Sequence, residues 1–197
     1  MSPLNDASDA RVGQYFAALQ HHAGQIDVAG IVAVVHRIEV ALANDATVFV
    51  AGNGGSALTA SHFTTDLAKT TLGDRLGGRR MRSVALTDNV GLLTAWANDY
   101  SFDDVFAEQV QNLGRRGDVI VLISCSGTSP NVLKAAKRSR LLGIDVVALT
   151  PSATPLAELA DVLVSVTGPN VQIMEDVHLA VCHAITLELQ RVVAHRP

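Results

Sequence analysis

The sequence predicts an open α/β sandwich built on a parallel sheet, and three observations carry this prediction. Short apolar runs recur along the chain, and amphipathic helical patterns lie between them. The runs are apolar on both faces, as strands must be when helices cover both sides of a sheet. Because parallel strands are joined by crossover connections, the helices between them are expected to supply those covering layers.

The elements follow in order along the chain. Two helical patterns precede the first strand, at about residues 12–22 and 28–43. Strands are predicted at residues 47–52, 83–87, 118–125, 145–150 and 161–166. The intervening and final helices are predicted at residues 56–71, 90–98, 102–113, 129–142, 155–160 and 171–193. We expect residues 1–197 to form one domain, with residues 1–45 as an N-terminal helical extension.

Composition narrows the class of protein. Apolar residues make up 48% and charged residues 17% of the chain, which is typical of a folded protein. The net charge of −4 argues against nucleic acid as a partner. The acidic start of the chain does not resemble a signal peptide, and no apolar run reaches the roughly 20 residues that span a membrane. Cys125 and Cys182 are expected as reduced thiols, which predicts a cytoplasmic protein.

The first predicted strand runs into the sequence GNGGS, which has the features of an anion site. Gly54 and Gly55 allow a sharp turn that exposes backbone amides, and Ser56 is expected to cap the helix that follows. Free N–H groups and the helix dipole then point at one place. The alternative is an ordinary turn between a strand and a helix.

The third predicted strand runs into a second loop of this kind, SCSGTSPNV. Ser124, Ser126 and Ser129 offer hydroxyl groups, Ser129 is placed to cap a helix, and Pro130 suits the first helical position. Hydroxyls and amides together suit a phosphate monoester, whereas no nucleotide-binding glycine motif is present. Asp88 follows the second strand and is expected at the same sheet edge. The alternative is that these serines only cap helices and turns.

The pair GNGGS and SxSGTSxNV resembles the sugar isomerase (SIS) domain, and four segments narrow the resemblance to the phosphoheptose isomerase group. These segments are GNGGSALTASHF, AWANDYSFDDVF, SCSGTSPNVLKA and EDVHLAVCH. The resemblance implies a flavodoxin-like three-layer sandwich with a five-stranded parallel sheet. It also implies conversion of D-sedoheptulose 7-phosphate to D-glycero-D-manno-heptose 7-phosphate, zinc, and a homotetramer with its sites between subunits.

Site residues follow from these patterns. The resemblance implies catalysis by Asp66 and His183, with His62, Asp66, Glu175 and His183 as zinc ligands. Residues expected at the substrate are Asn53, Gly54, Gly55, Ser56, Asp88, Ser124, Cys125, Ser126, Ser129, Gln172 and Glu175. The chain departs from the family at four of its positions: Asp66 replaces Glu, Glu175 replaces Gln, Cys125 replaces Thr and Thr70 replaces Arg.

The chemistry supports this assignment independently. Isomerisation needs a base beside a carbonyl and an acid at its oxygen, and a carboxylate and a histidine can serve. His62 and Asp66 lie one helical turn apart, so they share a face. Glu175 and His183 lie about 12 Å apart along a helix, so this spacing alone indicates a metal only weakly. Histidines with carboxylates form a set that suits zinc or iron.

Two alternatives remain open. One is an SIS isomerase that acts on another ketose phosphate, and the other is a non-catalytic SIS protein that binds the replication initiator. The presence of two histidines and two carboxylates at the family's active positions favours an enzyme. His178 is expected to pack or support the site, whereas other histidines are expected at the surface or an interface. These others are His21, His22, His36 and His195.

Overall fold

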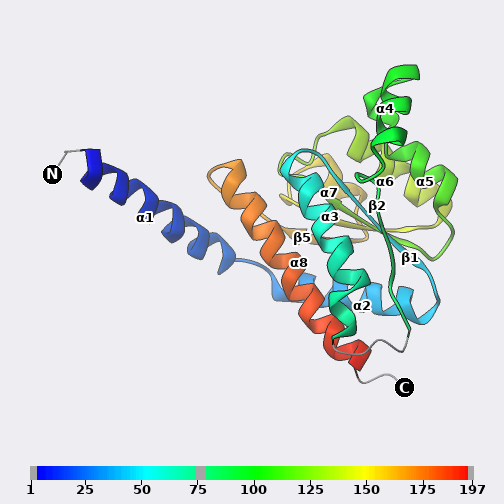
Figure 1. The fold of residues 1–197 in the computed structure, drawn as a ribbon, viewed down its shortest axis with the longest axis horizontal. Helices are drawn as coiled ribbons and strands as arrows, with labels where there is room; N and C mark the ends of the chain where they lie inside the picture. Colours follow the sequence, from blue (N-terminus) through cyan, green and yellow to red (C-terminus); the bar gives the residue numbers. More distant parts are fainter. Residues whose placement is uncertain (1–3, 74–78, 195–197) are drawn as a thin grey trace.

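The computed structural model describes residues 4–73 and 79–194 and has a parallel sheet at its centre (Figure 1). Its strands are β1 (Thr47–Gly52), β2 (Arg82–Ala85), β3 (Val119–Ile123), β4 (Asp145–Thr150) and β5 (Val162–Ser165). They lie in the order β2-β1-β3-β4-β5, and every neighbouring pair is parallel. This is the flavodoxin-like order, so the predicted fold class is confirmed.

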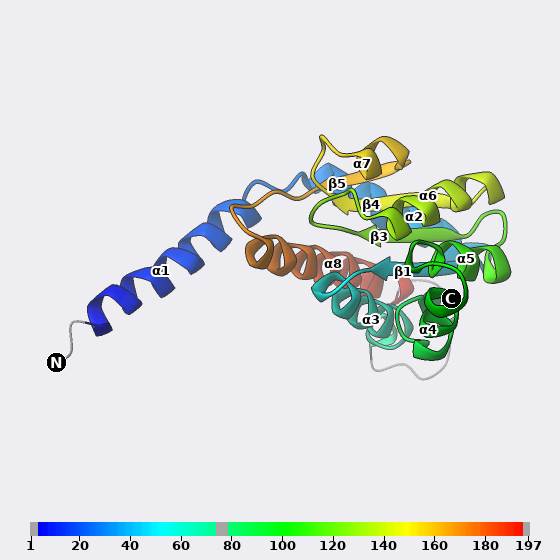
Figure 2. The ribbon, with the colours of Figure 1, turned by 90° about the horizontal axis from the view of Figure 1, so that it is seen from above.

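Helices cover both faces of the sheet, as Figure 2 shows. Their bounds are α1 (Leu4–Ala23), α2 (Val28–Ala43), α3 (Gly55–Ala68), α4 (Val90–Asp99), α5 (Ala107–Leu113), α6 (Pro130–Leu142), α7 (Pro155–Leu159) and α8 (Val171–Ala194). One core cluster joins α2, α3 and α8 to one face, and a second joins α5, α6 and α7 to the other. The three layers follow from the apolar faces that each strand presents on both sides.

Some predicted boundaries were wrong. Residues 4–11 extend α1 beyond the predicted start, because this polar first part of the helix has no apolar face by which the sequence pattern could mark it. The predicted helix 102–113 is divided into a 3₁₀ turn, Phe102–Asp104, and the short helix α5. The third strand ends at Ile123, so Ser124 and Cys125 belong to the loop that follows.

Helix α1 projects from the body of the molecule (Figures 1 and 2). It contacts α8, and the Tyr15 hydroxyl donates a hydrogen bond to the Asp176 carboxylate. Val12 and Phe16 on the same helix are 58% and 63% exposed. His195, expected at the surface or an interface, lies outside the described residues.

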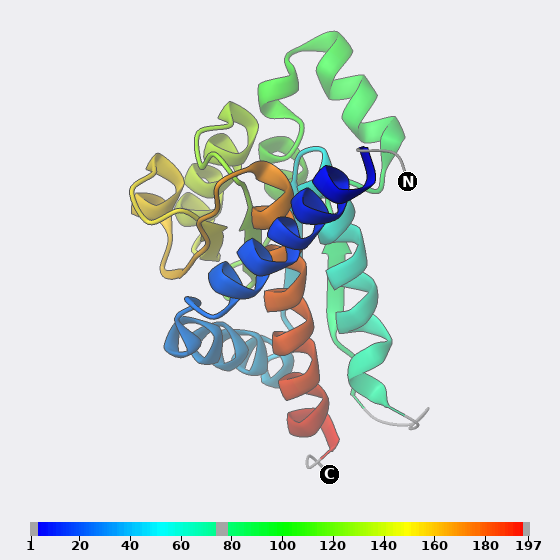
Figure 3. The ribbon, with the colours of Figure 1, turned by 90° about the vertical axis from the view of Figure 1, so that its left-hand side faces the viewer.

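Helix α8 is long and apolar enough to cross a membrane when judged by length and composition alone. In the structure it packs on the sheet instead, and Ile173, Val177, Val181 and Ile185 are buried in the core between them. It lies beside α3, as Figures 1 and 3 show. The apolar pattern of α8 is therefore used to hold α3, the helix that carries His62 and Asp66.

Stability should depend on the contact between α3 and the sheet. Phe63 is fully buried there, whereas Leu58 on the same helix is 74% exposed. Phe63→Ala is expected to lower the free energy of unfolding by about 3–5 kcal/mol, because it leaves a cavity. Leu58→Ala should change it by less than about 0.5 kcal/mol. Urea unfolding of both variants measures this, and equal stabilities would contradict the packing described.

Candidate active site

The two glycine- and serine-containing loops lie side by side at the point where the sheet reverses its strand order. β1 connects outward to β2, and its other neighbour β3 connects in the opposite direction to β4. Ligands of such sheets bind at this switch point, beyond the carboxyl ends of the strands. Paired side-chain amides join the loops: Asn53 and Asn131 each donate an Nδ2–H to the other's Oδ1, both at 2.9 Å.

The first loop turns sharply so that α3 begins inside the site. Gly54 has φ 56°, a left-handed conformation that favours glycine, and it is the N-cap of α3. The expectation that Ser56 caps this helix was wrong, because α3 begins one residue before it. Ser56 is instead the second residue of α3, and its side chain lines the pocket described next.

A pocket of about 190 Å³ lies between the two loops and the start of α8. It is lined by Asn53, Ser56, Ile123, Ser124, Cys125, Ser126, Ser129, Val171 and Glu175. Hydroxyl and amide groups dominate this lining, and no lysine, arginine or histidine of the described residues contributes to it. The pocket therefore offers an anion neutral donors and the N-terminal end of α3.

The serine hydroxyls are oriented by the backbone of their own loop. Ser124 Oγ accepts a hydrogen bond from Gly127 N at 3.0 Å, and Ser126 Oγ accepts one from Thr128 N at 3.3 Å. Each hydroxyl keeps its own O–H to donate. Ser129 is the N-cap of α6, as predicted, but its side chain makes no capping bond. This loop can thus direct hydroxyl donors at a bound anion.

Cys125 belongs to the serine loop, and the buried His178 side chain lies next to it. Cys125 Sγ lies 4.0 Å from Nδ1 of His178, which is fully buried. Burial raises the pKa of the Cys125 thiol, and the nearby Glu175 carboxylate raises it further. Burial lowers the pKa of His178 to about 4, so its imidazole stays neutral. His178 Nε2 has no hydrogen-bond partner in the part of the chain that the structure describes.

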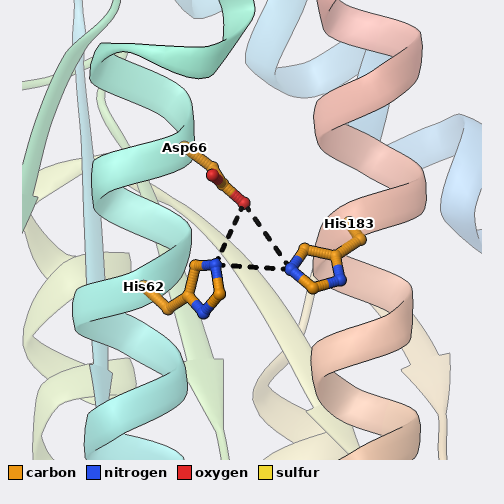
Figure 4. A group of neighbouring side chains, drawn as sticks. All are labelled: His62, Asp66 and His183. Atoms are coloured by element: carbon orange, nitrogen blue, oxygen red, sulfur yellow. Dashed lines mark hydrogen bonds and ion pairs between the residues drawn. The ribbon is translucent and has the colours of Figure 1, made fainter.

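Further along α3, three of the predicted residues form a close group (Figure 4). His62 Nε2 lies 3.4 Å from His183 Nε2 and 3.7 Å from Asp66 Oδ2. His183 Nε2 lies 3.8 Å from the same carboxylate oxygen. The two imidazoles are about half exposed, at 47% and 45%, whereas the Asp66 side chain is 13% exposed. One side of the group therefore faces solvent.

The Asp66 carboxylate is held in place from behind. Thr70 Oγ1 donates a hydrogen bond to its Oδ1 at 2.9 Å, which leaves Oδ2 to face the histidines. Cys182 lies fully buried nearby, and burial together with the Asp66 charge raises the pKa of its thiol. Thr70 thus orients a predicted catalytic residue.

The donor set of this group fits a divalent metal. Ligand atoms that bind zinc tetrahedrally at about 2.0–2.2 Å lie roughly 3.4 Å from one another. The distances between the two imidazole nitrogens and the carboxylate oxygen are 3.4, 3.7 and 3.8 Å. Three protein ligands with a solvent-facing side are typical of catalytic rather than structural zinc sites. The residues present therefore fit the ion that the resemblance implies.

The serine pocket and the group of His62, Asp66 and His183 lie at two positions along helices α3 and α8. Gly55 of α3 adjoins Glu175 of α8, and His62 approaches His183 further along, so both helices run in the same direction. His62 lies six positions after Ser56, which is about 9 Å along the helix axis. The two parts thus form one elongated site along α3 and α8.

Asp88 and Gln172 do not line the pocket at which they were expected, and Glu175 lies at only one of its two expected places. The Glu175 carboxylate lies against Gly55 in the serine pocket, and it is not in the group of His62, Asp66 and His183. Asp88 accepts a hydrogen bond from Ser61 beside α3 and does not line the pocket. Gln172 is exposed next to Val171, which does line it.

Known proteins are similar to this chain in both fold and sequence. A family model described as the SIS domain matches residues 14–151. A phosphoheptose isomerase from Neisseria meningitidis is 36% identical over 182 residues, which cover 89% of this chain and 91% of that protein. A phosphoheptose isomerase from Mycobacterium tuberculosis is 44% identical over 144 residues, with 72% and 71% of the two chains covered. The chain belongs to the SIS-domain phosphoheptose isomerase family.

Solved structures of this family have the same fold. The phosphoheptose isomerase from Neisseria gonorrhoeae is 34% identical with a TM-score of 0.84, and the match covers 95% of this chain and 99% of that one. The enzyme from Francisella tularensis has a TM-score of 0.85 at 28% identity, covering 97% and 100%. Because the matches span nearly whole chains, the family resemblance extends to the full described fold.

Sequence reasoning missed three residues that shape this site. Asn131 fixes the two loops to each other, Thr70 orients Asp66, and Ser61 bonds Asp88. Asn131 stands in the quoted SxSGTSxNV pattern of the SIS-domain family, two residues after Ser129. Its place in that pattern was a usable signal, whereas nothing local in the sequence marks the roles of the other two.

Buried His178 should make stability pH-dependent. Its folded-state pKa of about 4 lies below the ordinary value of 6.5, so protonation favours the unfolded chain. Above about pH 6.5 the histidine is neutral in both the folded and the unfolded chain and does not affect the stability. As the pH falls from 6.5 towards 4, the unfolded chain binds a proton that the folded chain does not, and the stability falls. Replacing it with Leu should flatten that part of the profile by up to about 1.4 kcal/mol per pH unit. The same change at exposed His36 is the control in urea unfolding, and an unchanged slope in His178→Leu would refute this.

Proposed function

We propose that this chain interconverts D-sedoheptulose 7-phosphate and D-glycero-D-manno-heptose 7-phosphate by proton transfer through an enediol. The single observation that carries the proposal is the elongated site, with an anion pocket at one end and paired histidines and a carboxylate at the other. The names of the most similar relatives, phosphoheptose isomerases, support the same activity.

The phosphate is assigned to the serine pocket. Ser124, Ser126 and Ser129 donate their hydroxyl groups, and Ser56 closes the opposite side with the amides at the start of α3. Hydrogen bonds from neutral donors to a charged group contribute about 1.5–3 kcal/mol each. Several such bonds together can bind a phosphate ester, so the pocket does not need a lysine or arginine to neutralise its charge.

The reach of the site favours a long sugar. About 9 Å of α3 separates Ser56 from His62, and Asp66 lies one turn further on. A phosphate seated at the start of α3 therefore needs an extended carbon chain to bring its carbonyl to the histidines. A heptulose 7-phosphate meets this requirement better than a short-chain ketose phosphate does.

Asp66 and His183 are assigned the proton transfers. Asp66 acts as the base that removes a proton from C1 of the ketose, and His183 protonates the oxygen on C2, which yields a cis-enediol. Loss of the proton from the oxygen on C1 and return of a proton to C2 then give the aldose. The bond from Thr70 to Oδ1 supports this role, because it leaves Oδ2 directed at the reacting side.

Zinc is proposed at His62, Asp66 and His183, whose donor atoms and spacing fit it. When bound, zinc supplies Lewis-acid polarisation of the substrate's carbonyl oxygen. A side chain that binds the metal is less free to act as an acid or a base. Of these two roles, proton transfer is preferred for His183 over permanent binding of the metal. Glu175, expected as a fourth ligand, is assigned to the substrate pocket that it lines.

A second candidate is an isomerase of a different ketose phosphate. The observation that favours it is the negative charge of Glu175 in the phosphate pocket, where the family's usual residue is neutral glutamine. A non-catalytic SIS protein is less well supported, because the histidines and Asp66 keep the mutual distances that chemistry requires.

The working unit is proposed as a homotetramer with sites between subunits, in the cytoplasm. Exposed Val12 and Phe16 on the projecting helix α1 support burial against a neighbouring copy. The solvent-facing histidines support it too, since an enediol needs shielding that this chain alone leaves incomplete. Both cysteines are free thiols, in keeping with a reducing compartment.

The first test of the function is turnover of a panel of ketose phosphates in D₂O, followed by NMR. The wild type should form the aldose from the heptulose phosphate, with deuterium at C2 of the product. Asp66→Asn and His183→Ala should each lower kcat by about 100-fold or more, whereas Glu188→Gln, exposed on the same helix α8, should not. If the wild type converts no sugar phosphate, the non-catalytic alternative replaces this proposal.

Assembly should depend on the apolar side of α1. Phe16→Asp places a charge on the exposed apolar face and is expected to shift the tetramer towards smaller species in light scattering. Gln14→Asp adds the same charge about 200° round the helix and serves as the control. A monomeric wild type at micromolar concentration would rule out the tetramer.

A further inference from the structure

The serine pocket contains one charged side chain, and it is negative. Glu175 is the only acidic or basic residue of the described chain that lines it. Its carboxylate also lies close enough to the serine loop to raise the pKa of Cys125. A pocket suited to phosphate thus already holds a carboxylate group.

The position of that carboxylate is the second observation. The atoms nearest to a methyl group added at Gly55 are all carboxylate atoms of Glu175, and they would overlap it. Gly55 is the first residue of α3, where amide groups and the positive end of the helix dipole attract anions. The absence of a side chain at Gly55 lets the Glu175 carboxylate reach this position.

The charge of Glu175 is not neutralised by a neighbouring side chain. Across residues 4–73 and 79–194, no ion pair joins the Glu175 carboxylate to a lysine, arginine or histidine. The attraction that remains is that of the start of α3. A phosphate arriving there would meet a like charge at close range, and such pairs repel strongly where solvent is limited.

We propose that the Glu175 carboxylate is an autoinhibitory contact: it lies against Gly55 at the start of α3, inside the anion pocket, and must be displaced when a phosphate group binds there. This inference rests on the proposed function and deepens it. Inorganic phosphate has only the pocket's own donors with which to displace Glu175. A sugar phosphate also contacts the rest of the elongated site, so its binding can offset the displacement. Glu175 therefore lowers the affinity of the pocket for any phosphate group, and only a ligand with further contacts along the site binds tightly enough to offset that cost.

The test is calorimetric titration of inorganic phosphate into the intact protein, with EDTA present and at constant pH and ionic strength. Glu175→Gln keeps the shape of the side chain and should bind phosphate about tenfold more tightly than the wild type. Glu188→Gln makes the same change in net charge on exposed α8 and should bind like the wild type. Adding Ser126→Ala and Ser129→Ala to Glu175→Gln should abolish the gain.

A second variant keeps the proposal testable if Glu175→Gln does not fold. Glu175→Ala also removes the charge and should show the same direction of change. Equal phosphate affinity in the wild type and both variants overturns the role of Glu175 but leaves the isomerase proposal intact if the wild type still converts sugar phosphates. Absence of phosphate binding in every variant, together with no turnover, overturns both.

Discussion

The reciprocal amide pair between Asn53 and Asn131 is the constraint on which the site depends. Each amide gives one donor and one acceptor to the other, so the loop after β1 is fixed to the start of α6. Asn131 is almost fully buried, so loss of Asn53 would leave the Nδ2–H of Asn131 without its partner. The distance between the two loops sets the width of the pocket. Three of its serines lie on the loop after β3, and the start of α3 follows the loop after β1.

The parallel course of α3 and α8 converts that local pocket into an extended site. Both helices pack on the same face of the sheet, and their contacts bring Gly55 to Glu175 and His62 to His183. Because the helices run in the same direction, the anion end and the histidine end are separated by a length that the helical rise sets. The core under α3 therefore determines the distance between the two ends of the site as well as stability.

Much of the fold could be predicted, because its signals are local. The apolar runs mark the strands, and the glycine and serine loops mark the edge of the sheet at which the pocket lies. The grouping of His62, Asp66 and His183 needed the family resemblance, since residues 62 and 183 are far apart in sequence. The position of Glu175 could not be predicted: helical spacing places it on the face of His183, but contact with Gly55 decides where its carboxylate lies. Likewise, the cap of α3 depended on the left-handed φ of Gly54 rather than on Ser56.

The buried thiol of Cys182 has a consequence for the choice of ion. Cysteine binds metals as thiolate, and the burial of Cys182 beside Asp66 raises its pKa and keeps it protonated. The neighbouring donors thus remain two imidazoles and one carboxylate, with no sulfur among them. Such a set disfavours soft ions such as copper(I), which prefer thiolate. Burial of Cys182 thus leaves this group with nitrogen and oxygen donors, the kinds of ligand that suit zinc or iron.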